Sequence, residues 1–236
     1  MCDRKQRLKS NLEQVQQRIA AAAEASGRAP GDVTLVAVTK YVDADITREL
    51  VEVGAHALGE NRPQTFWPKA EALADLDIQW HQIGHLQRNK LRRTLPYLSL
   101  LHSVDSVRLM DAVDRIQEEL DPDHPMPFLL EVNISGDEAK HGLKPDDVAA
   151  AIEAAAARKH ARLRGLMCMA GYGTTPDEAR RDFAALRELR DQLQARYPAQ
   201  ELAELSMGMS GDFEQAIAEG ATLVRVGSLL FEGIQQ

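Results

Sequence analysis

The sequence predicts an α/β protein, a closed barrel of eight parallel strands and eight helices, TIM-type, with an extra helix at its N-terminal end. Eight short apolar runs occur along the 236 residues, and amphipathic helical segments separate them. No change in composition marks a linker. Alternating strands and helices form parallel β–α–β units, and single α/β barrels often occupy about 200 to 250 residues. We therefore expect residues 1–236 to form one barrel domain.

The first predicted element is a helix over residues 1–27. Its apolar residues recur at steps of three and four, as an amphipathic helix requires, and they are Leu8, Leu12, Val15, Ile19 and Ala22. Gly27 is expected to end this helix. We expect the helix to pack on the barrel.

The eight apolar runs are the predicted strands. In chain order they cover residues 33–39, 56–59, 79–84, 98–104, 127–134, 163–170, 204–207 and 222–226. Between them, one helical segment ends at Gly54, a second follows the candidate cap Asp105, and a third spans residues 176–197. A doubly wound open sheet is the alternative, but it usually has a glycine-rich turn after its first strand. Residues 39–43 contain no glycine, which favours the barrel.

The composition limits which binding partners and which cellular compartment we expect for this protein. The net charge is −8, from 28 basic and 36 acidic residues, so nucleic acid and anionic membrane surfaces are not expected as partners. No apolar run approaches the roughly 20 residues that a membrane span needs. Two cysteines, Cys2 and Cys168, cannot form a disulfide framework. Cys168 is expected to be a core thiol, and we expect a cytoplasmic protein.

The loops after the seventh and eighth strands predict a phosphate site. Barrel active sites lie at the carboxyl ends of the strands, and these two loops often bind phosphate. The first loop is rich in glycine and serine, and Ser210 is expected to cap a helix that runs to Gly220. The second contains Gly227 and Ser228. Ordinary tight turns are the alternative for each loop alone, but two such loops together favour phosphate binding.

Two cationic residues are candidates for chemistry beside that site. Lys40 closes the first strand, where its amine either reaches solvent or attacks a carbonyl in the barrel mouth. Arg225 interrupts the apolar last strand, so it needs acceptors. It either forms a structural ion pair with a carboxylate such as Glu131 or donates to a ligand. A reactive lysine beside a phosphate site fits a sugar phosphate or pyridoxal 5′-phosphate (PLP), and the spacing does not choose between them.

Eight segments, in order along nearly the whole chain, resemble the PLP homeostasis family. They are LVAVTK (35–40), GEN (59–61), WHQIGHLQRNK (80–90), SVD (103–105), EVNIS (131–135), LRGLM (163–167), LSMGMS (205–210) and VRVG (224–227). The resemblance implies a barrel similar to the N-terminal domain of alanine racemases. It also implies a set of PLP-binding residues, namely Lys40, Asn61, Ser206, Met207, Ser210, Arg225, Gly227 and Ser228.

The resemblance assigns roles within this set. Lys40 would hold PLP as a Schiff base, and Arg225 would face the pyridine nitrogen. The residues implied to cradle the phosphate are Ser206, Ser210, Gly227 and Ser228. Asn61 would lie beside the ring or its substituents.

The chain departs from the family pattern at the rim. Many members have proline where this chain has His85, and proline shortly after the lysine where it has Tyr41-Val42-Asp43. Lys140 and His141 follow the fifth strand, where surface charge is the simplest interpretation, although Lys140 is a second amine near the mouth.

Other polar residues are expected to carry less chemistry. The basic residues between Arg88 and Arg93 are expected to form a solvated helix face, with an anion or partner contact as the alternative. The histidines, including His81 and His85, show no metal-binding pattern, and no metal is expected.

The same residues fit a PLP carrier or a PLP-dependent racemase. Alanine racemases have a further domain whose tyrosine supplies a second acid/base, and the present sequence ends ten residues after the last predicted strand. Only Tyr41 and Tyr172 could approach the site. We therefore expect a protein that buffers and delivers PLP without turnover, with apo-enzymes as recipients and a monomer favoured over a homodimer. A racemase is the alternative, and a Schiff-base aldolase or sugar-phosphate barrel is a remote one.

Overall fold

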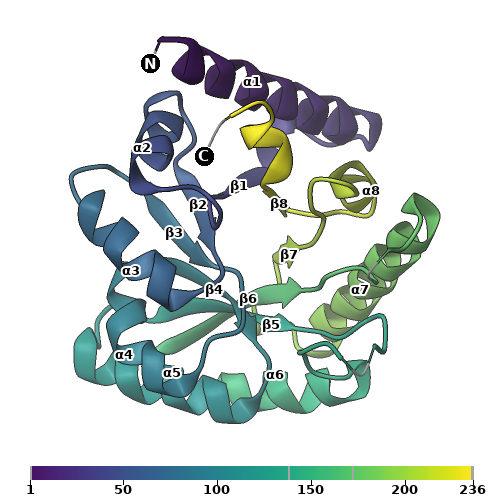
Figure 1. Ribbon diagram of the computed structural model, residues 1–236. Coiled ribbons are helices and arrows are strands. Elements are labelled where there is room, and N and C mark those ends of the chain that lie inside the picture. Colours follow the sequence, from purple (N-terminus) through teal and green to yellow (C-terminus); the bar gives the residue numbers. More distant parts are fainter. Residues whose placement is uncertain (1, 138, 172, 235–236) are drawn as a thin grey trace.

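The computed structural model describes residues 2–137, 139–171 and 173–234. Its strands form a closed parallel barrel in which each strand pairs with the next and β8 pairs with β1 (Figure 1). The strands are β1 (Thr34–Val38), β2 (Ala57–Glu60), β3 (Gln79–Gln82), β4 (Leu98–Val104), β5 (Met126–Glu131), β6 (Ala161–Met167), β7 (Glu204–Ser206) and β8 (Leu223–Val226). The predicted barrel is confirmed, and the open sheet is excluded by the closure.

Several predicted strands extend too far at their carboxyl ends. Residues 83–84, 132–134 and 168–170 lie outside the strands, although they continue the apolar runs. Several of these residues are nonetheless buried, among them Val132, Cys168 and Ala170. Ile83 and Met169 pack against the apolar cluster inside the barrel.

The helices surround the barrel (Figure 1). They are α1 (Cys2–Ala25), α2 (Ala44–Glu52), α3 (Pro63–Ala72), α4 (Leu91–Thr94), α5 (Val107–Leu120), α6 (Val148–Ala156), α7 (Pro176–Arg196) and α8 (Phe213–Ala218). The apolar stripe of α1 is buried, as its spacing predicts, and α1 packs against α8 and the 3₁₀ turn at Ser228–Phe231. Asn11 of α1 also donates to the carbonyls of Leu230 and Glu232, at 3.1 and 3.0 Å.

Two predicted helix caps are wrong by one or two residues. Ser106, not Asp105, caps α5, since its Oγ accepts from the backbone N–H of Leu109 at 3.3 Å. Ser210 does not cap α8, because a turn closed by the bond from Asp212 N to the Met209 carbonyl separates it from the helix. Asp105 and Ser210 are thereby left at the mouth.

The lower part of the barrel is filled. Five buried apolar side chains form a cluster inside it, namely Val36, Leu100, Leu129, Met167 and Leu223. The larger apolar cluster lies between the strands and the helices. The interior of the barrel is therefore packed with side chains and is not an open channel. Among the described helices, none is long and apolar enough to cross a membrane.

Candidate functional site

A cavity of about 730 Å³ opens at the carboxyl ends of the strands. Its size is typical of sites for small ligands. It is lined by Val38, Lys40, Tyr41, Asn61, Ile83, Gly84, His85, Glu131, His141, Met169, Met209, Ser210, Gly211, Arg225, Gly227, Ser228 and Phe231. The cavity lies at the end of the barrel where the sequence predicts the site.

The cavity brings together six of the eight predicted site residues. These six are Lys40, Asn61, Ser210, Arg225, Gly227 and Ser228. Ser206 and Met207 are fully buried and are not part of the lining. Ser206 instead contacts Arg225 from inside the barrel.

Lys40 is half-buried at the second position after β1. Its Nζ lies 4.8 Å from the centroid of the Tyr41 ring, and Tyr41 is 74% exposed. The preceding residue, Thr39, is fixed on two sides: its Oγ1 donates to Glu60 Oε1 at 2.7 Å, and its carbonyl accepts from Lys69 Nζ at 2.8 Å. The backbone just before Lys40 is therefore held by hydrogen bonds to β2 and α3.

A buried ion pair supports this backbone and was not predicted from the sequence. Lys69 Nζ of α3 lies 2.5 Å from Glu60 Oε1, and both side chains are almost inaccessible. A buried pair has to satisfy its remaining polar atoms with further hydrogen bonds, and the Thr39 carbonyl supplies one of them. The only signal in the sequence is a glutamate at the end of an otherwise apolar strand.

Arg225 is buried at the centre of β8. Its Nη1 donates to Ser206 Oγ at 2.5 Å and its Nη2 to the Cys168 carbonyl at 2.9 Å. No ion pair with Glu131 is formed within the part of the chain that the structure describes. Burial lowers the pKa of Arg225, and the nearby acidic groups oppose that change. A guanidinium carries five N–H groups, so donors remain for a ligand in the cavity.

Two buried histidines extend the contacts of Arg225 across the barrel interior. His102 Nδ1 lies 2.8 Å from Ser206 Oγ, and His102 Nε2 lies 2.8 Å from His81 Nδ1. Burial lowers the pKa of His81 to about 4 and that of His102 well below its usual value. Both rings are therefore neutral near pH 7. The sequence does not predict this chain of contacts, because it joins residues of four strands.

The loops after β7 and β8 are joined through Ser210. Its Oγ accepts from the backbone N–H of Gly227 at 3.1 Å. Gly227 lies close to β1, since an added Cβ would be 3.3 Å from the Val38 carbonyl oxygen. Within residues 173–234 and the other described ranges, the backbone N–H groups of Ser210 and Gly211 have no hydrogen-bond partner. These two donors line the cavity and are available to an anion.

Asn61 is held against the loop after β3. Gln82 Nε2 donates to the carbonyls of both Asn61 and Gly84, at 3.2 and 3.0 Å. Gly84 has to be glycine, because an added Cβ would lie 2.5 Å from the Asn61 carbonyl oxygen. The close approach of these two backbones forms one wall of the cavity.

Glu131 lines the cavity but is absent from the predicted cofactor set. Its side chain lies at the end of β5 and is 4% exposed. Burial, with a smaller contribution from Asp105, raises the pKa of Glu131 to about 7. Cys168 is fully buried, as predicted for a core thiol, and burial raises its pKa to about 12.

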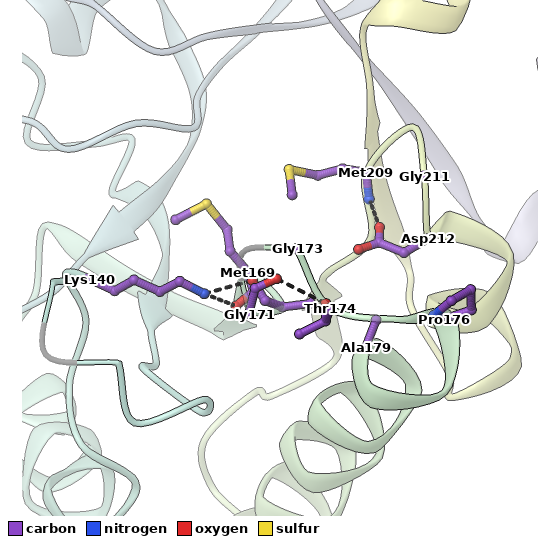
Figure 2. Close-up of a pocket in the computed structure, with 11 residues that line it drawn as sticks. Lys140, Met169, Gly171, Gly173, Thr174, Pro176, Ala179, Met209, Gly211 and Asp212 are labelled. Atoms are coloured by element: carbon purple, nitrogen blue, oxygen red, sulfur yellow. Dashed lines mark hydrogen bonds between the residues drawn. The ribbon is translucent and has the colours of Figure 1, made fainter.

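A smaller hollow of about 360 Å³ lies beside the cavity, with Met169, Met209 and Gly211 in both linings (Figure 2). Lys140 points into its wall, where its Nζ donates to the Ala170 carbonyl at 2.6 Å. The amine of Lys140 is therefore tied to the loop after β6. Tyr172, the second tyrosine expected near the site, lies outside the described residues.

The predicted solvated face between Arg88 and Arg93 is exposed and paired with neighbouring helices. Arg92 contacts Glu119 of α5, and Arg93 Nη2 lies 3.0 Å from Glu71 of α3. These pairs account for Arg92 and Arg93 without a further ligand.

Comparison with known proteins identifies the family. The sequence model of the alanine racemase N-terminal domain matches residues 5–234. A pyridoxal phosphate homeostasis protein of Aquifex aeolicus is 40% identical over 220 residues, which cover 93% of this chain and 95% of that protein.

Two solved structures are similar to this chain, one in sequence and fold and the other in fold alone. PipY of Synechococcus elongatus with PLP bound is 38% identical with a TM-score of 0.80, covering 90% of this chain and 99% of that one. An alanine racemase of Clostridium difficile shares the fold, with a TM-score of 0.71 and 14% identity, and the match covers 96% of this chain and 56% of that one. The chain belongs to the pyridoxal phosphate homeostasis family, whose barrel is that of the alanine racemase N-terminal domain.

Proposed function

We propose that this protein binds PLP in the cavity through Lys40 and acts in PLP homeostasis, by holding and delivering the cofactor rather than by turning over an amino acid. The observation that carries the proposal is the convergence of an amine, a guanidinium and two anion-binding loops on one cavity of about 730 Å³. The PLP-bound structure of PipY, 38% identical to this chain, supports the choice of ligand.

The residues of the cavity fit the three polar parts of PLP. Lys40 offers a primary amine, with which the aldehyde of PLP reacts when the cofactor is bound. Arg225 offers unused N–H donors for the pyridine nitrogen. For the phosphate we propose the Ser210 and Gly211 backbone N–H groups, with Gly227 and Ser228 beside them. Asn61 would contact the ring.

Ser206 has a different role in this proposal from the one that the resemblance implies. It is fully buried, and its Oγ accepts from Arg225. We assign it to holding the guanidinium in place, together with His102. Met207, fully buried beside it, would fix the start of the phosphate loop.

Arg225 favours a carrier over most PLP-dependent reactions. The guanidinium of arginine is always charged, and it donates hydrogen bonds but accepts none. The pyridine nitrogen therefore has to accept the hydrogen bond, which disfavours the protonated form of the ring. A ring that is not protonated is a weaker electron sink, which disfavours transamination and decarboxylation.

Racemisation is the second candidate function and needs a second acid/base near the cofactor. Among the described residues of the lining, the tyrosine is Tyr41, and 74% exposure leaves its hydroxyl poorly positioned. The match to the Aquifex homeostasis protein covers 95% of that chain, which favours the homeostasis role.

We further propose apo-enzymes as recipients, a monomeric state and a cytoplasmic location, as expected from the sequence.

Delivery and turnover can be separated in one pair of assays. The PLP-loaded protein is mixed with an apo-aminotransferase, and the recovery of aminotransferase activity is followed. The same preparation is incubated with single enantiomers of several amino acids, and the products are resolved by chiral chromatography. We expect recovery of activity with wild type and none with Lys40→Ala. We expect no racemisation above the Lys40→Ala level. Racemisation that depends on Lys40 would favour the second candidate.

A further inference from the structure

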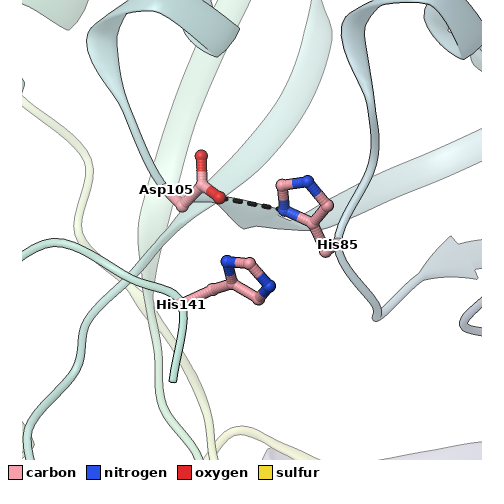
Figure 3. A group of neighbouring side chains, drawn as sticks. All are labelled: His85, Asp105 and His141. Carbon is pink, nitrogen blue, oxygen red and sulfur yellow. Dashed lines mark hydrogen bonds and ion pairs between the residues drawn. The ribbon is translucent and has the colours of Figure 1, made fainter. Parts of the chain in front are cut away.

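Three metal-ligating side chains meet at the rim of the cavity (Figure 3). His85 follows β3, Asp105 follows β4, and His141 lies in the loop after β5. Because consecutive parallel strands end at the same rim, these loops are neighbours. One ligand atom from each of the three side chains lies within 4.8 Å of the other two.

The carboxylate of Asp105 anchors the group. Its Oδ2 lies 3.0 Å from His85 Nδ1, and its Oδ1 accepts from Ser106 Oγ at 3.0 Å. The side chain of Asp105 is 15% exposed, and that of His85 is 41% exposed. The acceptor is thus fixed, and the imidazole beside it is exposed to solvent.

The two imidazoles face each other. Their centroids are 4.3 Å apart and their planes differ by 16°. Parallel stacking forms no hydrogen bond between the rings, and no partner for the His141 ring nitrogens is found among the described residues. Nitrogen atoms with available lone pairs therefore lie beside a fixed carboxylate.

The distances suit a small divalent cation after a modest adjustment. Metal–nitrogen bonds to Zn²⁺ are about 2.0–2.1 Å, so the ligand atoms of a tetrahedral site are roughly 3.3–3.5 Å apart. His85 and His141 are both exposed, so their rings have room to close the difference from 4.8 Å when a cation binds. The buried carboxyl of Glu131 lines the same cavity as His85 and His141.

We propose that His85, Asp105 and His141 form a binding site for a divalent transition metal, with Zn²⁺ the best match. Two imidazoles and one carboxylate are a ligand set that Zn²⁺ accepts, and three protein ligands leave a fourth position open. His85 and His141 also line the cavity, so the proposed metal site lies at its rim. The site is independent of Lys40.

Calorimetric titration tests the proposal directly. The full chain is freed of metal with a chelator, freed of any histidine tag, and titrated with ZnCl₂ near pH 7.5 without added PLP. The variants are His85→Ala, His141→Ala and Asp105→Asn. A matched control is His124→Ala: His124 pairs with Asp121 at 2.9 Å, but it stacks on no second imidazole among the described residues.

We expect one Zn²⁺ per wild-type chain, at least tenfold weaker binding in each site variant, and wild-type binding in His124→Ala. Co²⁺ in place of Zn²⁺ should give visible d–d bands that are lost in His85→Ala. The proposal is overturned by absence of stoichiometric binding, or by wild-type affinity in both His85→Ala and His141→Ala. Both histidines are surface residues, so these two variants remain informative even if Asp105→Asn does not fold.

The PLP absorbance of each variant is recorded in parallel. Normal PLP binding without zinc binding would refute only the metal site. Loss of PLP binding in Lys40→Ala with zinc binding retained is the result expected if the two sites are independent.

Discussion

Arg225 shows how a single buried charge shapes the site. Burying a guanidinium is costly unless its donors find acceptors, and a lone arginine in an apolar strand is therefore visible in the sequence. Its acceptors are not visible. Ser206 and the Cys168 carbonyl come from two other segments, and their distance from Arg225 depends on how the barrel closes. The carboxylate that the sequence suggested, Glu131, is not an acceptor among the described contacts.

Glu131 predicts a pH dependence of stability. The folded-state pKa of about 7 exceeds the ordinary value of 4.5, because burial disfavours the charged form. Glu131 therefore stabilises the folded state fully below about pH 4.5. This stabilisation is lost as the pH rises through about 7. Over that window the loss is on the order of 3 kcal/mol. In Glu131→Gln this loss should be absent.

The pH dependence is measured by urea unfolding of wild type and Glu131→Gln between pH 5 and pH 8, without added PLP. The free energy of unfolding of the variant should rise relative to wild type as the pH rises. The exposed Glu13 is the control, and Glu13→Gln should follow wild type. If the difference in free energy of unfolding between Glu131→Gln and wild type does not change with pH, the pKa of Glu131 is not raised by burial.

At the scale of elements, periodicity predicts helices and strands well but their ends less well. The stripe of α1 and the eight apolar runs are confirmed. The runs ending at residues 84, 134 and 170 overshoot because apolar residues that follow the strands are also buried or packed against the barrel core. The cap errors at Asp105 and Ser210 have a similar origin: a residue suited to capping is used at the site instead, in contact with His85 or Gly227.

Gly208 controls how α8 lies against the loop after β7. Its φ is +91°, and an added Cβ would lie 2.6 Å from Ala216 Cβ and 2.9 Å from Phe213 Cα. Its carbonyl also accepts from Arg225 N at 3.0 Å. Gly208→Ala combines a left-handed backbone with overpacking, so it should lower the free energy of unfolding by about 2–4 kcal/mol.

Gly211, in the same loop, is the control for this substitution. Its φ is not positive, and nothing lies within 4 Å of an added Cβ. Gly211→Ala should change the free energy of unfolding by less than about 0.5 kcal/mol. Equal losses in both variants, measured by urea unfolding, would show that Gly208 has no special role.

At the scale of the whole molecule, barrel closure creates the site. The pairing of β8 with β1, in which Arg225 is opposite Val36, brings the last strand beside the one that ends near Lys40. The barrel and the position of the site at its mouth could be predicted, because alternation and loop composition are local signals. Glu131, the His81–His102 pair and the His85–Asp105–His141 group could not, since each depends on the register of several strands or on loop paths.

We propose that Lys40 is the residue that carries PLP. The most direct measurement is borohydride reduction of the protein with PLP, followed by mass mapping of the peptides. We expect a pyridoxyl group on the Lys40 peptide of wild type and its absence in Lys40→Ala. Lys140→Ala, which removes the other amine near the mouth, should retain the Lys40 adduct. An unmodified Lys40 peptide in wild type, at PLP concentrations that saturate the absorbance change, would contradict the account.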